Sequence, residues 1–359
     1  MKAIRLTGRP EIEHAFEWTE RDIPTPSEHD VLVRVEAISI NPVDTKIRKA
    51  GSTQDIIGWD AVGIVEATGD SVTGFTRGDR VYYAGDVQRP GCYAEYQCVD
   101  ARLVAKAPAN LEIEEIAALP LTTLTAWEGL FDRLPLTPHS PASSDHDEDD
   151  TASSSETATT SSTPNEQKTL LVINGAGGVG SMVTQLAKQL TSLKVITTAS
   201  RSLSRLWSEE LGADLVVNHY HLVEELRAAG IEEVDYIFCC HDIADHWENM
   251  VQLIRPFGNI VAIAETEREV NINDLQHKAA SFAWEFMFSR AIYNEHPEHQ
   301  GEILARVAQW IDSGDLVSTL SEVIGRFSVE SIQEAHHRLE KGTVVGKLVL
   351  PINQTHGSL

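Results

Sequence analysis

The segment LLVINGAGGVGSMVTQLAKQL, residues 170–190, places four glycines within six positions, between an apolar run and an amphipathic run. The glycines are Gly175, Gly177, Gly178 and Gly180. The apolar run is typical of a buried strand, and the run that follows has the spacing of a helix over about 178–190. A G-x-G-x-x-G turn in this context allows the backbone, Val179 included, to approach a pyrophosphate, whose charge meets the free N–H groups of the helix start. The segment therefore predicts a dinucleotide site, with a merely close-packed glycine turn as the alternative.

The order of strand-like and helix-like runs around this segment predicts two kinds of domain. From residue 169 onward, strand-like runs alternate with helix-like runs; the former are TLLVIN (169–174), KVITTA (194–199), DLVVN (214–218), VDYIFCC (234–240) and GNIVAIAE (258–265). This alternation indicates a doubly wound parallel sheet covered on both faces. The first 120 residues or so contain short β-rich runs between glycine turns, and DVLVRVEAISI (30–40) alternates like a half-buried strand. We expect an antiparallel, barrel-like domain there.

Composition limits the class of protein. The chain has 359 residues, 42% hydrophobic and 23% charged, which is enough for two domains. Its formal charge of -25 argues against binding nucleic acid or an acidic membrane. No apolar run is long enough to span a membrane, and the charged N-terminus lacks the pattern of a secretory signal, so we expect a cytoplasmic protein. Four cysteines are too few for a disulfide framework, and we expect them to be reduced.

The acidic segment at about 138–168 differs from the rest of the chain. It contains no Ile, Leu, Val, Phe, Tyr or Trp, so it has almost nothing to bury against the entropy of ordering. We predict a disordered insertion that serves as a solvated spacer; its Ser/Thr-acid pattern leaves phosphorylation as an alternative.

The end of the second predicted strand indicates which dinucleotide is bound. An NAD site usually has an Asp or Glu about 20 residues beyond the glycine fingerprint, where it binds the ribose 2′-OH. Here that position is Ser200, followed by Arg201 and, four residues later, Arg205. A hydroxyl and guanidinium groups attract a 2′-phosphate that a carboxylate would repel. The pattern favours NADPH, with ordinary surface charges at the start of a helix as the alternative.

Several motifs in order carry a resemblance to a known family. They are NPVDTKIR (41–48), GWDAVGIVEATGDSVTGFTRGDRVY (58–82), LPLTTLTAWEGLF (119–131), NGAGGVGS (174–181), SFAWEFMFSR (281–290) and GTVVGKLVLP (342–351). Together they resemble the medium-chain dehydrogenase/reductase superfamily, in its quinone oxidoreductase branch, particularly the proteins labelled zinc-type alcohol dehydrogenase-like.

This resemblance implies a GroES-like β-barrel catalytic domain joined to a Rossmann domain. The catalytic domain would comprise 1–121 and 293–359, with the NADPH-binding domain at 122–292. The resemblance also implies a homodimer, formed through the edge strand near Phe282 to Phe288.

The zinc ligands of the superfamily do not match this chain. By motif position the three catalytic ligand slots hold Asn41, Trp59 and Leu121, none of which supplies a thiolate or an imidazole. Only Cys92 and Cys98 stand where the zinc-dependent members carry four structural cysteines. Three histidine pairs remain, and we interpret them as exposed residues without a third ligand: His219 with His221, His296 with His299, and His336 with His337. We therefore predict that no metal is bound.

Without a Lewis acid, reduction of an electron-poor acceptor is the reaction that remains. We predict hydride transfer from NADPH to a quinone or an α,β-unsaturated carbonyl. From motif positions, the resemblance implies that Asn41 and Asp44 line the site near the nicotinamide, that Thr125, with Thr122 as a possible helper, contacts the cofactor, and that Lys347 reaches the diphosphate. The family's quinone reductases commonly have an aromatic residue where this chain has Lys46. The proton donor stays open, with Tyr83 and Tyr93 as candidates; a zinc alcohol dehydrogenase with unrecognised ligands and a non-catalytic NADPH-binding protein are the alternatives.

Overall fold

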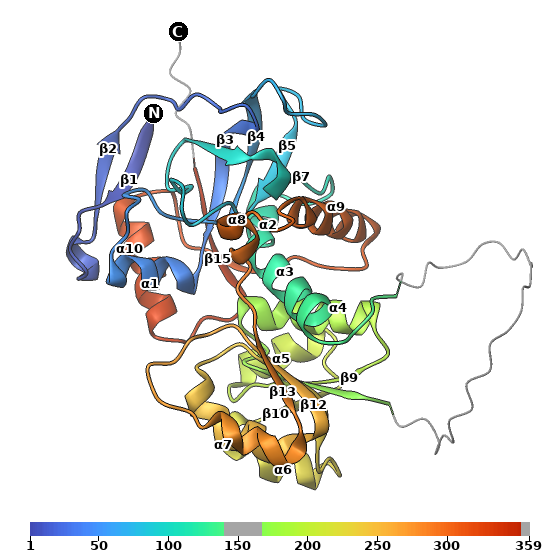
Figure 1. Ribbon diagram of the computed structural model, residues 1–359. Helices are drawn as coiled ribbons and strands as arrows, with labels where there is room; N and C mark the ends of the chain where they lie inside the picture. Colours follow the sequence, from blue (N-terminus) through green and yellow to red (C-terminus); the bar gives the residue numbers. More distant parts are fainter. Residues whose placement is uncertain (140–166, 353–359) are drawn as a thin grey trace, which may run out of the picture.

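The computed structural model describes residues 1–139 and 167–352, and the predicted disordered segment lies almost entirely outside the described residues. Figure 1 shows two halves: strands β1 to β7 with α1, α9 and α10 in the upper half, and β9, β10, β12 and β13 with α5, α6 and α7 in the lower half. The chain crosses between the halves more than once, because β15, near the C-terminal end of the described residues, returns to the upper half.

The strands have the following bounds: β1 Lys2–Leu6, β2 Phe16–Glu20, β3 Asp30–Ile40, β4 Ala61–Thr68, β5 Arg80–Tyr83, β6 Tyr96–Asp100, β7 Val104–Lys106, β8 Thr169–Ile173, β9 Lys194–Thr198, β10 Leu215–Val217, β11 Val234–Cys239, β12 Ile254–Ala262, β13 Ser281–Trp284, β14 Leu320–Val323 and β15 Lys347–Pro351.

The helices have the following bounds: α1 Pro42–Ala50, α2 Ile113–Ala117, α3 Pro120–Trp127, α4 Gly178–Leu190, α5 Ser202–Glu210, α6 Leu222–Ala228, α7 Ile243–Leu253, α8 Ser289–Tyr293, α9 Glu298–Ser313 and α10 Val329–Glu340. Short 3₁₀ segments are η1 Ile12–His14, η2 Ala101–Leu103, η4 His219–His221 and η5 Ile272–Lys278, and η3 Glu128–Arg133 is a π-helix that continues α3.

The lower half is a six-stranded parallel sheet in the order β10-β9-β8-β11-β12-β13. Alternate residues of its central strands pack on opposite faces, as a period of two requires. On one face, Leu170 and Val172 of β8 belong to a core that includes residues of α4; on the other, Leu171 and Ile173 belong to a core that includes residues of α6 and α7. Helices therefore cover both faces, which confirms the predicted doubly wound architecture.

The upper half is built on a seven-stranded, mainly antiparallel sheet in the order β14-β15-β3-β4-β5-β7, with β6 also paired to β3. The prediction that 30–40 forms a half-buried strand is wrong in its burial. In β3 all residues but Arg34 and Glu36 are buried, because β3 pairs with β4, β6 and β15 and lies inside the barrel-like domain. One hydrophobic core joins this domain to the α4 face of the parallel sheet.

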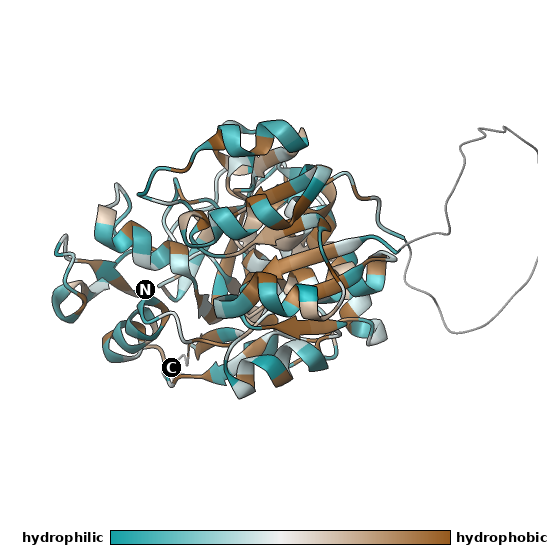
Figure 2. Cartoon of the chain, turned by 90° about the horizontal axis from the view of Figure 1, so that it is seen from below, coloured by the Kyte–Doolittle hydropathy of each residue, from teal (hydrophilic) through white to brown (hydrophobic). Residues whose placement is uncertain are grey.

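Hydropathy follows this arrangement. Figure 2 shows hydrophobic colouring on strands in the interior, while many helices turn hydrophilic residues outward. Among residues 1–139 and 167–352, none of the helices combines the length and apolar character that crossing a membrane requires.

Candidate functional site

The carboxyl ends of the parallel strands form one row of residues. The pairing register puts the last residues of four strands at the same level of the sheet. These residues are Val217 of β10, Thr198 of β9, Cys239 of β11 and Ala262 of β12. The residues two positions beyond the strand level are His219, Ser200, Gly175, His241, Ala264 and Phe286, from β10 across to β13. Ligands of open α/β sheets bind at this edge, so the row outlines the candidate site.

The glycine turn sits at the centre of the row, between β8 and α4. A Cβ atom at Gly180 would lie 2.3 Å from the carbonyl oxygen of Asn174, and one at Gly175 would lie 2.5 Å from the Cβ of Thr197. These two positions therefore require glycine because the turn packs against its own strand and against β9. The first N–H groups of the 13-residue helix α4 have no intrahelical acceptor. Bare backbone and a helix N-terminus fit a pyrophosphate, and the contact itself stays a prediction.

The barrel-like domain closes on the glycine turn. The N–H of Gly346 donates to the carbonyl of Ala176 at 2.8 Å, and Gly346 also forms a parallel bridge with Gly177. A Cβ atom at Gly178 would lie 2.7 Å from the Cδ of Lys347 and 3.0 Å from the Cγ2 of Thr122. The stem of Lys347 and the side chain of Thr122 thus line the turn.

The predicted 2′-phosphate residues have different surroundings. Arg201 is exposed and donates from one Nη to the carbonyl of Thr343 at 2.8 Å. Arg205 is half-buried and donates to the carbonyls of Ala199 at 3.3 Å and Val216 at 2.8 Å. Arg205 therefore ties α5 to the sheet in this conformation, and Arg201 is the guanidinium with donors free to meet an anion at the end of β9.

Lys347 lies in a buried polar cluster at the domain junction. Its Nζ atom contacts Asn41 Oδ1 at 2.5 Å, Asp60 Oδ2 at 3.2 Å and the carbonyl oxygen of Ile40 at 3.2 Å. Asp60 also accepts from the Nδ2 of Asn41 at 3.1 Å and from the N–H of Leu121 at 3.1 Å. The ammonium is thus held by Asn41 and Asp60 in this conformation, and the predicted diphosphate contact would require it to move. Burial raises the pKa of Asp60, and the nearby ammonium opposes that shift.

Asp44 belongs to a second buried chain of hydrogen bonds. Its Oδ2 atom accepts from the N–H of Asn41 at 2.9 Å and from the Tyr93 hydroxyl at 3.1 Å. The same hydroxyl lies 3.1 Å from Nε2 of His336. Burial raises the pKa of Asp44 to about 7, so this carboxyl holds a proton into the neutral range. The interpretation of His336 as an exposed residue is wrong: its ring is fully buried, and burial lowers its pKa to about 3.

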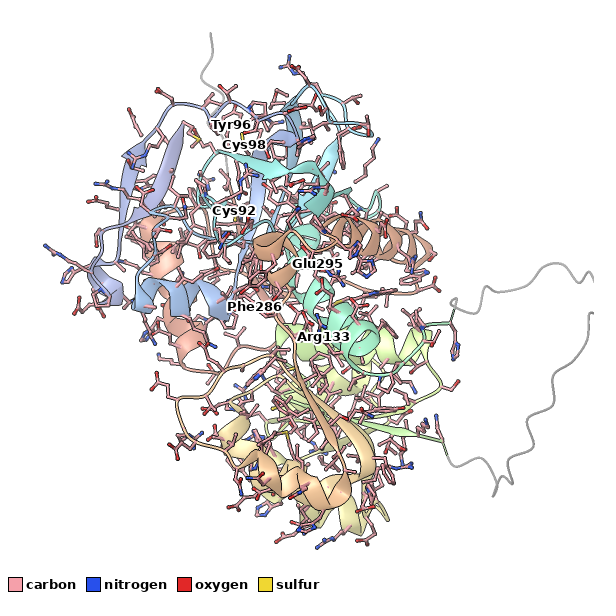
Figure 3. The ribbon with its side chains drawn as sticks, viewed as in Figure 1. Cys92, Tyr96, Cys98, Arg133, Phe286 and Glu295 are labelled. Atoms are coloured by element: carbon pink, nitrogen blue, oxygen red, sulfur yellow. The ribbon has the colours of Figure 1, made fainter. Side chains whose placement is uncertain are left out.

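Thr125 is buried on α3, and its hydroxyl donates to the carbonyl of Leu121 at 2.9 Å. The residue of α3 that contacts the glycine turn is Thr122, one turn earlier. The segment after β13 also lies where the two halves meet: Figure 3 shows Phe286 and Arg133 in the middle of the molecule. Phe288 packs edge-on against Trp59 with ring centroids 6.2 Å apart, so the segment after β13 reaches the barrel-like domain.

The residues in the zinc slots do not fit zinc. Trp59 is fully buried and donates its Nε1–H to the carbonyl of Asp86, and Leu121 supplies only apolar atoms and a backbone N–H. Next to Asn41 stands the ammonium of Lys347, a cation that competes with a metal for the same oxygen atoms. Cys92 and Cys98 both lie in the upper half (Figure 3), and residues 1–139 and 167–352 contain no cluster of three or more His, Cys, Asp or Glu suited to a metal.

Comparisons with known proteins agree with this geometry. Residues 27–109 match the family "Alcohol dehydrogenase GroES-like domain", and residues 211–350 match "Zinc-binding dehydrogenase". The chain is 42% identical over 342 residues to a zinc-type alcohol dehydrogenase-like protein of Staphylococcus aureus strain MSSA476, covering 94% of this chain and 95% of the relative. The chain belongs to the medium-chain dehydrogenase/reductase superfamily.

Two further relatives define its place in the superfamily. A quinone oxidoreductase of Lama guanicoe is 27% identical over 98% of this chain and 97% of its own length. A crystal structure described as that of a zinc-dependent alcohol dehydrogenase protein from Rhizobium etli CFN 42 is 35% identical with a TM-score of 0.88, covering 99% of this chain and 98% of that chain. The chain is an oxidoreductase with the superfamily's two-domain fold, in the quinone oxidoreductase-like branch.

Sequence reasoning missed Asp60 and the contact between Tyr93 and His336. Asp60 is buried, yet it stands in the apolar run IIGWDAVGIV (56–65), and a lone acid in such a run is a signal that it needs a partner. The partner, Lys347, lies near the other end of the chain, so no local pattern could identify it. The link from Tyr93 to His336 was missed for the same reason.

Proposed function

We propose that this oxidoreductase is zinc-independent and transfers hydride from NADPH to a quinone or an α,β-unsaturated carbonyl. The observation that carries the proposal is the buried contact between Lys347 Nζ and Asn41 Oδ1 at 2.5 Å, beside Asp60. Asn41 occupies one of the three ligand slots assigned by motif position, and the ammonium beside it competes with a metal for the same oxygen atom, which supports the proposal. An alcohol substrate would lack its Lewis acid, whereas a conjugated acceptor carries the developing negative charge within its own π-system.

In this proposal different residues bind the cofactor, orient the acceptor and hold a proton. NADPH, when bound, supplies the hydride. The glycine turn and the start of α4 hold its diphosphate, and Ser200 with Arg201 selects its 2′-phosphate. Asn41 and Lys347 carry N–H donors at the junction. In this conformation the donors are paired with Asp60 and with backbone carbonyls, so they would have to leave these partners to orient a carbonyl oxygen. Asp44 holds a proton at its carboxyl group near neutral pH, hydrogen-bonded to Tyr93.

The test combines metal analysis with an acceptor panel. Protein purified without chelator is analysed for total metal, treated with EDTA or phenanthroline, and assayed with NADPH against quinones and enones. We expect turnover to survive chelation and added zinc to leave it unchanged, because the residues in the ligand slots cannot bind zinc.

Two outcomes would overturn the proposal. Stoichiometric zinc whose removal abolishes turnover would identify a zinc alcohol dehydrogenase with ligands from elsewhere in the chain. Tight NADPH binding without turnover of any acceptor would identify a non-catalytic NADPH-binding protein.

A further inference from the structure

Three histidines surround the adenosine end of the candidate site. His219 and His241 belong to the row of residues beyond the strand ends, after β10 and β11, and Ser200 and Gly175 lie between them in that row, after β9 and β8. His246, on α7, lies between the two: its ring centroid is 6.3 Å from that of His219 and 5.4 Å from that of His241. The three imidazoles thus span the strands that a dinucleotide's adenosine half would cover.

His246 forms the neutral part of this group. It is 8% exposed, and burial lowers its pKa to about 4. Its Nδ1 atom is buried and has no hydrogen-bond partner among the described residues. A buried nitrogen without a partner is uncommon in folded proteins, and a bound ligand or water would satisfy it.

The charges around His219 disfavour its protonation when the site holds no anion. Burial lowers the pKa of His219, and the nearby charges of His241 and Arg201 lower it further. His241 contacts Asp245 at 3.4 Å, but Asp245 and Asp242 are shared with the guanidinium of Arg268, at 2.6 Å and 3.1 Å. The cationic or titratable groups that face His219 are Arg201 at the start of α5, His241 after β11 and His246 on α7. The nearby carboxylate of α6, Glu225, accepts from the N–H of Asn218, and among residues 1–139 and 167–352 no ion pair joins His219 to a carboxylate.

A 2′-phosphate placed at Ser200 and Arg201 would reverse this balance. Ser200 and His219 each follow the paired residues Thr198 and Val217 at the ends of the adjacent strands β9 and β10. The charge of Arg201 acts on His219, so a dianion bound by Ser200 and Arg201 would lie near His219. A dianion in that place favours the imidazolium form. Protonation of His219 and binding of the 2′-phosphate would then be coupled, each strengthening the other.

We propose that His219, assisted by His241, is a specificity-determining residue that takes up a proton when the 2′-phosphate binds, so that the preference for NADPH over NADH grows as the pH falls from about 8 to 6.5. This inference rests on the proposed NADPH assignment. It is separate from the role of Arg201, whose charge is the same throughout this range.

Calorimetry with cofactor fragments tests the coupling without any turnover. Binding of 2′,5′-ADP and of 5′-AMP to the full chain is measured between pH 6.5 and 8 in buffers of different ionisation enthalpy, which gives the number of protons exchanged. We expect more proton uptake with 2′,5′-ADP than with 5′-AMP. Both fragments carry the 5′-phosphate, so the difference between them belongs to the 2′-phosphate. The dissociation constant of 5′-AMP divided by that of 2′,5′-ADP should rise as the pH falls, by at most about tenfold per pH unit for each proton taken up.

The variants separate the histidines from the arginine. In His219→Gln the uptake should fall by about half or more, and in the double variant His219→Gln/His241→Gln it should change sign, because a phosphate bound by Arg201 alone favours its own dianion and so releases a proton. Arg201→Ala should weaken 2′,5′-ADP at every pH. His14→Gln, an exposed histidine on η1 in the other domain, is the matched control and should behave as wild type.

The two proposals fail in different ways. If the wild-type chain binds 2′,5′-ADP more tightly than 5′-AMP but takes up no more protons with it, or takes up extra protons that both histidine variants retain, the histidine inference is wrong and the NADPH assignment stands. If the chain binds both fragments equally and prefers NADH, the NADPH assignment itself is wrong.

Discussion

At the scale of single residues, Asp44 must accept two hydrogen bonds, which favours its ionised form, while its side chain is buried, which disfavours the charge. Its carboxylate caps α1 by accepting from the N–H of Asn41, and it also accepts from the Tyr93 hydroxyl. Its Oδ1 atom, however, is buried and has no hydrogen-bond partner within the part of the chain that the structure describes. The ionised form is therefore costly, and the protonated form would leave one oxygen free to accept the same bonds. Burial therefore outweighs the hydrogen bonds and raises the pKa of Asp44 to about 7.

Replacing Asp44 by Asn should change how the stability depends on pH. The folded pKa is about 7 and the unfolded value is 3.8, so between these values the unfolded chain has released a proton that the folded chain keeps. The wild-type free energy of unfolding therefore falls as the pH rises through this window, by up to about 4 kcal/mol. We expect Asp44→Asn to match wild type near pH 4 and to exceed it at pH 8 in thermal unfolding.

The control for this experiment is Asp22→Asn, which changes an exposed carboxylate in the same domain. It should shift the melting temperature little at either pH. An Asp44→Asn variant whose difference from wild type is constant between pH 4 and 8 would show that Asp44 is ionised throughout and that the junction stabilises its charge.

At the scale of elements, a pair of buried carboxyl groups joins three segments around the site. Glu128 begins the π-helix after α3, Glu285 follows β13, and both are at most 2% exposed. Glu128 accepts from Gln300 of α9 at 3.0 Å and contacts Arg290 at 3.2 Å, while Glu285 accepts from Arg133 at 3.1 Å. Burial, together with the charge of Glu128, raises the pKa of Glu285 to about 8. The two acids cannot both ionise cheaply at neutral pH.

The variant Glu285→Gln should remove an alkaline loss of stability. Because the folded pKa lies above the unfolded value of 4.5, stability is fully present below pH 4.5 and is lost as the pH rises through about 8. Glutamine keeps the size and an acceptor for Arg133 without the charge. We expect the melting temperature of Glu285→Gln to exceed that of wild type by several degrees at pH 9 but not at pH 5, measured by scanning calorimetry.

Glu114→Gln, a substitution at a less buried glutamate of α2, serves as the comparison. If Glu285→Gln is less stable than wild type at pH 9 as well as at pH 5, Glu128 and Glu285 are both ionised and are stabilised by their arginines. The claim that the two acids cannot both ionise cheaply would then be wrong.

The elements also show how far the sequence could predict the structure. The helix over 178–190 was predicted to the residue, because its start is set by local glycines and its apolar spacing is continuous. The burial of β3 was missed, since it depends on pairing with β15 from the other end of the chain. Asp60 and Lys347 were missed as a pair for the same reason. Local patterns specify elements, whereas the buried polar contacts of the site depend on which distant segments the fold brings together.

At the scale of the whole molecule, the parallel sheet ends in an edge strand that is apolar and accessible. Strand β13 is the last in the order, and Trp284 is 49% exposed, as is Phe286 just beyond it. Trp284 packs against Phe282 with ring centroids 5.1 Å apart, so the aromatic side chains form one patch along the edge. A free edge of this kind is a template for pairing with another chain.

We propose that two copies of the chain pair through β13 about a two-fold axis, which would continue the parallel sheet of one copy into that of the other and cover the patch in both. Light scattering during gel filtration should then give twice the mass of a single chain. Trp284→Lys should shift the distribution towards monomer, because it puts a charge against its own symmetry mate. Trp18→Lys is the matched control: Trp18 is 48% exposed and also packs on one aromatic neighbour, Phe327, but lies on β2 in the other domain. A monomeric wild-type chain, or a dimer that Trp284→Lys leaves intact while Trp18→Lys dissociates it, would mean that the β13 edge is not the interface.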